Sequence, residues 1–533
     1  MATGISSLGQ QGGQEEDQQE VIAFLSSPES HGLAPGDQVS CIQTHGAFVF
    51  LAGQFAYKLK RAVRLPYLDF STLDKRQAVC RHEVELNRRT APKLYLGVEA
   101  VVRRPDGRLA IGGRGGDEGD TVDWLVKMRR FPDGALLSRA VADGPLSQQI
   151  LNALADTIAE FHRTAEVSNA WGGADELRRI AAVDQAVIAR FTPGLFAPKQ
   201  AAAVAALTVE TIETQRTLLE ERRYRGFVRH GHGDLHLANI YLAKSFPDSD
   251  RPTMFDAIEF DDRLAQNDTL YDLAFLLMDL WHRGLLGEAN RVFNRYLLRS
   301  EDMGGLPALP LFLSMRARIR TQVTALTAAA RNDDPDLRAE AVRYLDLAAA
   351  ALKPPPPVLL AVGGYSGSGK SHLAAALAPS LGAMPGAVHL RSDELRKVML
   401  GSDPETPLGQ DAYTSKISAK VYDTLRHRAG LALSAGQAVI ADAVHNRPDS
   451  RAALAELAAR LEVPFVGIWL DADTNLMADR IAGRRGDASD ADRSVMQRQV
   501  RHGAGTIEWR RLDAAAPLAE KVAQVQAWVG AIV

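Results

Sequence analysis

One loop of the chain carries residue types that suit phosphoryl transfer, in the order His232-Gly233-Asp234-Leu235-His236-Leu237-Ala238-Asn239. A carboxylate such as Asp234 can orient an acceptor hydroxyl and accept its proton, so it is a candidate catalytic base. A carboxamide five residues later, Asn239, can hold a metal ion on the same side of the loop. The spacing therefore predicts a catalytic base and a metal ligand in one loop.

Two strand candidates follow this loop, at 240–242 and 254–260, and the second carries two carboxylates, Asp256 and Glu259. Either of them could bind the Mg²⁺ that bridges the phosphates of a nucleotide. Strand register favours Asp256, and we predict it as the metal ligand with Glu259 as the alternative.

A second phosphate-binding pattern begins at Gly364 and reads Gly-x-x-x-x-Gly-Lys-Ser, ending at Ser371. It follows an apolar run, 358–362, and opens a predicted helix, 372–381, which is the strand–loop–helix context that a P-loop requires. Backbone N–H groups of such a loop close around phosphates, the lysine reaches the β- and γ-phosphates, and the serine hydroxyl binds Mg²⁺. The residues expected to contact the nucleotide are Gly364, Ser366, Gly367, Ser368, Gly369, Lys370, Ser371 and His372.

The residues after the P-loop supply candidates for an acceptor side. Asp393 follows a predicted strand, 387–390, and is placed to act as a general base, with Arg396 holding the substrate. Asp442 ends a third strand, 438–441, and suits a role near Mg²⁺. An arginine-rich helix end with a polar loop follows a fourth strand, 465–470, and is typical of a lid that closes over phosphates.

The elements that must position these residues change character along the chain. Residues 39–126 read as short strands and turns with one helix, 73–89, and the chain beyond about 145 reads as mostly helical. The run Lys353–Pro357 cannot continue a helix and predicts a spacer. We therefore expect a tail at 1–20, a first domain at 21–350 with lobes at about 21–128 and 129–350, a linker at 351–357 and a second domain at 358–533.

Residues 40–350 resemble the aminoglycoside phosphotransferase and choline kinase family, through the His-Gly-Asp-x-His-x-x-Asn loop and the later Asp272-Leu273-Ala274. The resemblance implies a two-lobed, protein-kinase-like α+β fold, with Asp234 as base and Asn239 as metal ligand. The similarity of Ile-Glu-Phe to the Ile-Asp-Phe of that family favours Glu259 over Asp256 for the second metal ligand.

The same resemblance implies residues on the nucleotide side of this fold. A lysine of the small lobe should pair with a helix glutamate and reach the α- and β-phosphates. Lys58 fits better than Lys60, which shares its strand face. Glu83 is the expected partner and Glu85 the alternative. The backbone of the lobe connection, 123–128, would meet adenine, which makes Met128 a candidate contact.

Residues 358–533 resemble P-loop kinases of the gluconate kinase, zeta toxin and polynucleotide kinase type, which implies an α/β domain with a parallel sheet. In that family's pattern Arg480 and Arg484 contact the transferring phosphate. The whole order resembles bacterial proteins described as bifunctional aminoglycoside phosphotransferase/ATP-binding proteins. It implies ATP and Mg²⁺, and two sites that phosphorylate hydroxyl groups of small molecules. The alternatives are one active kinase regulated by a nucleotide-binding domain, and a polynucleotide-kinase-like or toxin-like enzyme.

Composition narrows the class of partner. The 533 residues include 65 acidic and 62 basic side chains, a formal charge of −3, which argues against a general nucleic-acid or membrane binder. Two cysteines, Cys41 and Cys80, give no disulfide framework and favour a reducing, cytoplasmic compartment. No apolar run is long enough to span a bilayer.

Overall fold

The structure is a computed structural model that describes residues 17–34, 36–44, 46–65, 68–112, 119–242, 251–483 and 489–532. The chain groups into two compact units, each formed from separate stretches. The first unit comprises Met1–Glu176, Glu221–Leu276 and Ala329–Asn332, and the second comprises Leu177–Glu220, Leu277–Ala328 and Asp333–Val533. The tail predicted at 1–20 lies outside the described residues as far as residue 16, and a helix begins at Gln19.

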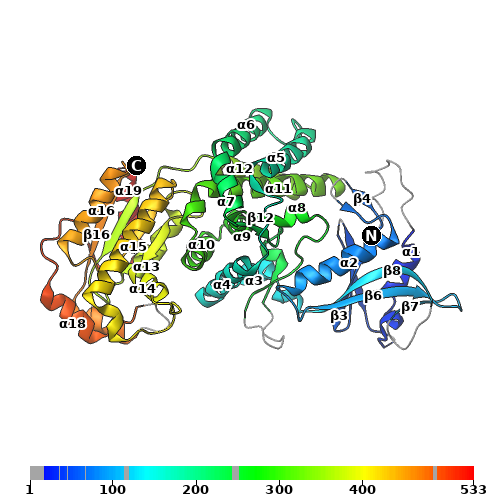
Figure 1. Ribbon diagram of the computed structural model, residues 1–533, viewed down its shortest axis with the longest axis horizontal. Helices are drawn as coiled ribbons and strands as arrows, with labels where there is room; N and C mark the ends of the chain where they lie inside the picture. Colours follow the sequence, from blue (N-terminus) through cyan, green and yellow to red (C-terminus); the bar gives the residue numbers. More distant parts are fainter. Residues whose placement is uncertain are drawn as a thin grey trace. The chain divides into compact units, whose positions relative to one another are not determined.

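The first unit is built on a six-stranded antiparallel sheet with the order β1-β2-β3-β8-β6-β7 (Figure 1, blue to cyan). Its strands are β1 (Val39–Gln43), β2 (Ala47–Ala52), β3 (Phe55–Lys60), β6 (Tyr95–Arg103), β7 (Leu109–Ile111) and β8 (Asp120–Arg129). In agreement with the short strands and turns predicted over 39–126, β2 and β3 form a hairpin around Gly53, and β6 and β7 form one around Pro105–Gly107.

The two faces of this sheet bury different residues because side chains alternate along a strand. Leu125 of β8 faces a cluster that includes Leu25 of helix α1 (Gln19–Ser26), whereas Val126 faces Cys80 and Val84 of helix α2 (Leu73–Arg88). Helix α2 thus lies along one face of the sheet, and this fixes the position of its charged residues relative to β3.

The loop with the His-Gly-Asp motif connects β9 (Val228–His230) to a 3₁₀ turn (Leu237–Asn239) and β10 (Ile240–Tyr241). Strand β10 pairs with β11 (Thr253–Met254), and β9 pairs with β12 (Gln266–Asp268). The strand predicted over 254–260 is wrong beyond Met254, because Asp256 adopts a left-handed backbone conformation with a φ of 61°. Short strands β4 (Arg64–Leu65) and β5 (Leu68–Asp69) and helices α3 (Leu137–Asp143), α4 (Gln148–Thr164) and α8 (Asp262–Ala265) complete this unit.

The second unit contains a five-stranded parallel sheet with the order β14-β15-β13-β16-β17 (Figure 1, yellow to red). Its strands are β13 (Leu359–Gly363), β14 (Val388–Arg391), β15 (Val439–Asp442), β16 (Phe465–Asp471) and β17 (Arg510–Asp513). The chain runs from β13 to β14 on one side of the sheet and from β15 to β16 on the other side. The crevice for ligands in such a sheet therefore lies at the carboxyl ends of the neighbouring strands β13 and β15.

One face of the parallel sheet packs on helices α13 (Lys370–Leu377) and α19 (Leu518–Gly530) through a fully apolar cluster that includes Leu360, Val362 and Ile468. The other helices after β13 are α14 (Ser392–Met399), α15 (Ser415–Ser434), α16 (Pro448–Arg460), α17 (Thr474–Ala482) and α18 (Arg493–His502). The second unit also includes α6 (Pro198–Thr214), α10 (Leu286–Ser300) and α12 (Pro335–Ala351).

Four helices, α5 (Gly173–Arg190), α7 (Arg216–Tyr224), α9 (Thr269–His282) and α11 (Leu309–Ala330), contain residues of both units. The prolines 354–357 are irregular chain between α12 and β13. The predicted classes are present: an α+β part with an antiparallel sheet is followed by an α/β part with a parallel sheet. Within the described ranges, every helix is too short or too polar to cross a bilayer.

Candidate functional site

The first candidate site begins with two lysines on one face of β3 that reach the same glutamate on α2. Lys58 Nζ lies 2.8 Å from Glu83 Oε1, and Lys60 Nζ lies 2.5 Å from Glu83 Oε2. Burial alone would raise the pKa of Glu83, but the two ammonium groups outweigh it and lower the pKa to about 2. The predicted ion pair between Lys58 and Glu83 is therefore formed, whereas Glu85 is exposed on α2.

Asp256 and Glu259 are the two alternatives that the sequence offers for the second metal ligand. Each of them pairs with one of the two lysines. Lys58 Nζ lies 2.6 Å from Asp256 Oδ1, and Lys60 pairs with Glu259. The side chain of Asp256 is 40% exposed and that of Glu259 is 8% exposed. Asp256 thus stands at the open end of the cluster, beside the lysine expected to meet phosphates, and Glu259 lies at the buried end.

Backbone hydrogen bonds, not a strand, fix Asp256 in this position. Its N–H donates to the hydroxyl of Tyr95 at 3.2 Å, and the next N–H, of Ala257, donates to Asn87 Oδ1 at 2.9 Å. The N–H of Phe255 donates to the carbonyl of Asn239 at 3.0 Å, so the two segments with candidate metal ligands are joined directly. These anchors come from α2 and β6, and local sequence patterns around residue 256 give no sign of them.

The buried carboxylate of Asp272 anchors the His-Gly-Asp loop. Asp272 accepts the N–H groups of His232 at 2.7 Å and Gly233 at 2.9 Å, and it lies 3.2 Å from His162 Nε2. Burial lowers the pKa of His232, so this histidine is neutral and its Nε2 donates to the carbonyl of Phe255 at 2.9 Å. Asp272 is the first residue of the Asp-Leu-Ala motif, and these contacts show that it anchors the His-Gly-Asp loop.

The candidate base Asp234 is oriented by two neighbours in its own loop. Asn239 Nδ2 donates to Asp234 Oδ2 at 2.9 Å. His236 Nδ1 accepts the N–H of Ala238 at 3.2 Å, so the ring proton is on Nε2, which lies 3.3 Å from Asp234 Oδ2. The amide nitrogen of Asn239 is thereby turned to the base, and its amide oxygen is the atom left to bind a metal.

The lobe connection predicted over 123–128 is wrong in its position. These residues lie inside β8, where their backbones pair with β3 and β6, and the connection follows Arg129. Asp123 instead forms a buried ion pair with Arg76, with 2.8 Å between Oδ1 and Nε. Met128 lies one residue before the end of β8 and is half-buried, and its contact with adenine stays a prediction.

The second candidate site is the P-loop between β13 and α13. Gly364, Gly367 and Gly369 have φ values of 141°, 87° and 96°, which L side chains rarely adopt. A Cβ at Gly367 would lie 2.6 Å from the carbonyl oxygen of Met477, so this position has no room for a side chain. The loop forms a narrow cradle at a helix N-terminus, and Lys370 bends back over it, with Nζ 3.1 Å from the carbonyl of Tyr365.

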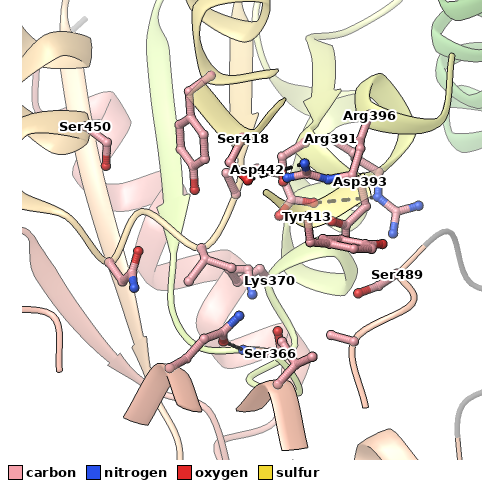
Figure 2. A pocket seen from close by; sticks show the side chains of 18 of the residues that line it. Ser366, Lys370, Arg391, Asp393, Arg396, Tyr413, Ser418, Asp442, Ser450 and Ser489 are labelled. Atoms are coloured by element: carbon pink, nitrogen blue, oxygen red, sulfur yellow. Dashed lines mark hydrogen bonds and ion pairs between the residues drawn. The ribbon is translucent and has the colours of Figure 1, made fainter. Parts of the chain in front are cut away.

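The P-loop opens onto a cavity of about 1140 Å³, which also meets Asp393, Arg396 and Asp442 (Figure 2). Six of the residues predicted to contact the nucleotide line this cavity, namely Ser366, Gly367, Gly369, Lys370, Ser371 and His372. Gly364 and Ser368 complete the loop behind them. The sequence placed these groups on separate strands, and the fold brings them to one edge of the sheet.

Asp442 and Asp393 differ in their electrostatic surroundings. Burial alone would raise the pKa of Asp442, but His389, Arg391 and Lys370 lower it to about 2. Its Oδ2 lies 3.1 Å from His389 Nε2. Burial raises the pKa of Asp393 despite a hydrogen bond from Ser489 and the charges of Arg391 and Lys370. One carboxylate is thus a strong anion and the other a better proton acceptor.

The predicted arginines lie in different places. Arg396 Nη1 donates to the carbonyl of Ala412 at 2.9 Å, and the guanidinium lies 4.7 Å from the ring centre of Tyr413, so it supports the acceptor-side loop. Arg480 donates to the carbonyls of Ser368 at 3.0 Å and Ala514 at 2.9 Å, against the back of the P-loop. Arg484 lies outside the described residues.

Several contacts within this site were not predicted from the sequence. Asp490 accepts from the fully buried Lys397 at 3.0 Å, from the N–H of Leu408 at 2.9 Å and from the hydroxyl of Tyr413 at 2.9 Å. His389 was read only as part of a strand. An isolated lysine in an amphipathic helix or a histidine in a strand has no spacing signal, because its partner lies 50 or more positions away.

The donor sets of both sites fit a nucleotide with Mg²⁺. Mg²⁺ usually takes one or two carboxylates and completes its shell with phosphate oxygens and water. Ser371 with Asp442, and Asn239 with Asp256, are sets of that kind. No cluster of three or more His, Cys, Asp or Glu side chains suited to a metal occurs among the residues with described positions.

Comparison with known proteins finds similarity along the chain. Residues 359–504 match the sequence model of the AAA_33 family, described as an AAA domain. The uncharacterized protein Rv2004c of Mycobacterium tuberculosis (strain ATCC 25618 / H37Rv) is 28% identical over 513 residues, which cover 95% of this chain and 98% of that protein. The P-loop domain predicted from the sequence is confirmed by the family match.

Three solved structures are among those similar to this chain. A gluconokinase from Sinorhizobium meliloti 1021 is 24% identical, with a TM-score of 0.24, over 32% of this chain and 90% of its own. A choline/ethanolamine kinase family protein from Mesorhizobium loti is 14% identical, with a TM-score of 0.36, over 60% and 89%. A thermostable mutant of aminoglycoside phosphotransferase APH(4)-Ia is 14% identical, with a TM-score of 0.37, over 61% and 98%. These protein classes are those that the sequence resembled.

Proposed function

We propose that this chain is an ATP-dependent phosphotransferase with two sites, each of which transfers the γ-phosphate to a hydroxyl group of a small molecule. The observation that carries the proposal is the cavity at the P-loop, where phosphate-binding and acceptor-side groups share one wall. A nucleotide-binding module alone would need the P-loop, but it would have no use for a half-buried carboxylate with a raised pKa opposite Lys370.

At the P-loop, bound ATP with Mg²⁺ supplies the phosphoryl group. The backbone N–H groups of the loop hold the phosphates, and Lys370 neutralises charge on the β- and γ-oxygens. Ser371 and Asp442 would provide oxygen ligands for the metal, and Asp393 would accept the proton of the acceptor hydroxyl. The acceptor oxygen bonds to phosphorus as the bond between phosphorus and the β,γ-bridging oxygen breaks.

In the kinase-like part, the same task is divided among other residues. Glu83 holds Lys58 in position for the phosphates, and Asn239 and Asp256 would provide oxygen ligands for the metal. Asp234 orients the acceptor hydroxyl and takes its proton, while Asn239 and His236 fix its carboxylate. Met128 and the chain after it would meet the base of the nucleotide. ATP and Mg²⁺ are the cofactors of both sites, and neither needs a nucleic acid or a membrane.

The test uses [γ-³²P]ATP and fractionated metabolite pools with the full chain. Wild type, Asp234→Ala and Lys370→Ala are compared, with Asp106→Ala and Lys416→Ala as surface controls for the same changes of charge. Two labelled products, each lost in one active-site variant only, would support two sites. The controls should keep both products within about twofold of wild type.

Other outcomes separate the alternatives. If Lys370→Ala changes the rate of the other site without losing a product of its own, the P-loop part regulates one active kinase. If label enters oligonucleotides in a salt-sensitive manner, the polynucleotide-kinase alternative holds. If no pool acquires label from wild type, the phosphotransferase proposal fails.

A further inference from the structure

Helix α10 precedes the segment that matches the P-loop family, yet it belongs to the same compact unit as the parallel sheet. Its Asn294 lies along β14, the edge strand of that sheet. Asn294 Oδ1 accepts the N–H of His389 at 2.7 Å, and Asn294 Nδ2 donates to the carbonyl of Ala387 at 3.1 Å. The side-chain amide therefore pairs with β14 as the peptide group of a neighbouring strand would.

A second asparagine continues this contact toward the start of the strand. Asn290 is buried, and its Nδ2 donates to the carbonyls of Pro385 at 3.1 Å and Ala387 at 3.0 Å. Asn294 Nδ2 also donates to Asn290 Oδ1 at 3.0 Å, so the two amides support each other. An edge strand otherwise presents its N–H and C=O groups without a partner on one side. Helix α10 satisfies the N–H of His389 and the carbonyl of Ala387 at the start of β14.

Strand β14 delivers residues of the P-loop site, so its position matters for chemistry. The residue whose N–H meets Asn294 is His389, whose ring lies 3.1 Å from the carboxylate of Asp442. The strand ends at Arg391, and Asp393 follows two residues later. A displacement of β14 would move a partner of the candidate metal ligand and the candidate base together.

Two arginines of α10, Arg295 and Arg299, contact the loop at residues 401–409, on the acceptor side of the site. Arg295 forms a two-pronged ion pair with Glu405, with Nη–Oε distances of 2.9 and 3.0 Å, and Arg299 Nη2 lies 2.8 Å from Asp403 Oδ2. The side chain of Arg295 is 6% exposed and that of Glu405 is 47% exposed, so the pair is buried on the side of α10. Its two-pronged geometry is the stronger form of an arginine–carboxylate contact. Leu408, near the end of this loop, lines the cavity.

We propose that α10 is a positioning element of the P-loop site, in which Asn294 fixes strand β14 and Arg295 fixes the acceptor-side loop. This inference rests on the proposed function of that site. It assigns to residues outside the P-loop segment a role in its chemistry. Asn294 acts on groups of the transition state, and Arg295 acts on binding of the acceptor.

The roles proposed for Asn294 and for Arg295 predict different kinetic changes in the full chain. Asn294→Leu keeps the volume of the side chain and removes its amide, so kcat of the Lys370-dependent reaction should fall about tenfold with little change in the acceptor KM. Arg295→Gln should raise the acceptor KM several-fold and leave kcat within about twofold. Glu405→Gln should match Arg295→Gln, and the double variant should add no further change.

Glu288→Gln, on the same helix, is the matched control and should match wild type. Hydrogen exchange of the backbone amides of β14 provides a readout that needs no activity: His389 should exchange at least tenfold faster in Asn294→Leu than in wild type, whereas β16 should be unchanged. Unchanged exchange at His389, or a kcat within twofold of wild type, overturns the proposal. Absence of a Lys370-dependent product from wild type refutes the proposed function instead, and the exchange data still decide whether α10 holds the strand.

Discussion

The pair Asp256→Asn and Glu259→Gln separates the proposed metal binding from structural support in the first unit. The two carboxylates lie on one segment and pair with lysines two residues apart on β3. Each change removes one charge and keeps the shape of the side chain. Because Asp256 is at the open end of the cluster and Glu259 at its buried end, we expect the first change to affect the reaction and the second to affect the fold.

The magnitudes follow from exposure and from the partners that remain. In Asp256→Asn, Lys58 keeps Glu83, and the lost pair involves a side chain that is 40% exposed, so the free energy of unfolding should change by less than about 1 kcal/mol. The loss of a metal-ligating charge should lower kcat/KM by about 10²-fold or more.

In Glu259→Gln, Lys60 is 2% exposed and keeps Glu83, and the new amide oxygen can still accept a hydrogen bond. The cost should lie between that of a hydrogen bond to a charged group and that of a broken buried pair, about 2–4 kcal/mol. Burial raises the pKa of Glu259, which already offsets part of the attraction, so we expect the lower half of that range. For a unit of this size, this corresponds to a fall in Tm of roughly 4–12 °C.

The assay measures thermal unfolding by near-UV circular dichroism and initial rates of the Asp234-dependent reaction over a range of Mg²⁺ concentrations. Asp256→Asn should need more Mg²⁺ for half-maximal rate at an unchanged Tm. Glu259→Gln should keep the Mg²⁺ dependence of wild type at temperatures below its own transition. The reverse pattern, with the Mg²⁺ dependence shifted only in Glu259→Gln, would refute the assignment of Asp256 as metal ligand.

Two further predictions concern the P-loop site. Ser489→Ala removes a hydrogen bond that lowers the pKa of Asp393, so this pKa should rise further. The acid limb of the pH profile of kcat/KM should then move to higher pH, with little change on the alkaline side. An acid limb that stays in place or moves to lower pH would contradict Asp393 as the base. Gly367→Ala places a methyl group 2.6 Å from the carbonyl of Met477 at a positive φ, so ATP affinity by calorimetry should fall at least tenfold while the Asp234-dependent reaction stays within twofold of wild type; wild-type ATP affinity would show that the cradle tolerates a side chain.

The parts of the fold that were predictable depend on interactions close in sequence. The hairpin of β2 and β3 and the strand–loop–helix of the P-loop both follow from local patterns, namely alternation around Gly53 and a glycine-rich turn after an apolar run. The pairing of Lys58 with Glu83 followed from a family pattern. In each case the residues that decide the structure lie within a short window or in a recurring motif.

The features that sequence reasoning missed depend on partners far along the chain. Met254–Phe260 has the composition of a strand, but Asn87 and Tyr95 draw the backbone at 256 and 257 into another conformation. Asp123–Met128 was placed in a connection on the basis of the family resemblance, yet pairing on both sides keeps it inside the sheet. Tertiary hydrogen bonds of this kind override local propensity, and one sequence carries no signal for them.

The contacts of α10 also bear on where the P-loop part begins. The prolines 354–357 and the family match both suggest a start near residue 358, because composition and motif change there. Hydrogen bonding gives another answer: a chain cut at the prolines would leave the N–H of His389 and the carbonyl of Ala387 without Asn294. It would also leave Glu405 without Arg295. Since unpaired groups at a sheet edge favour pairing with other chains, such a fragment should associate or lose order at β14, the strand that carries the link to Asp442. We therefore expect the smallest fragment with a fully ordered P-loop site to include α10.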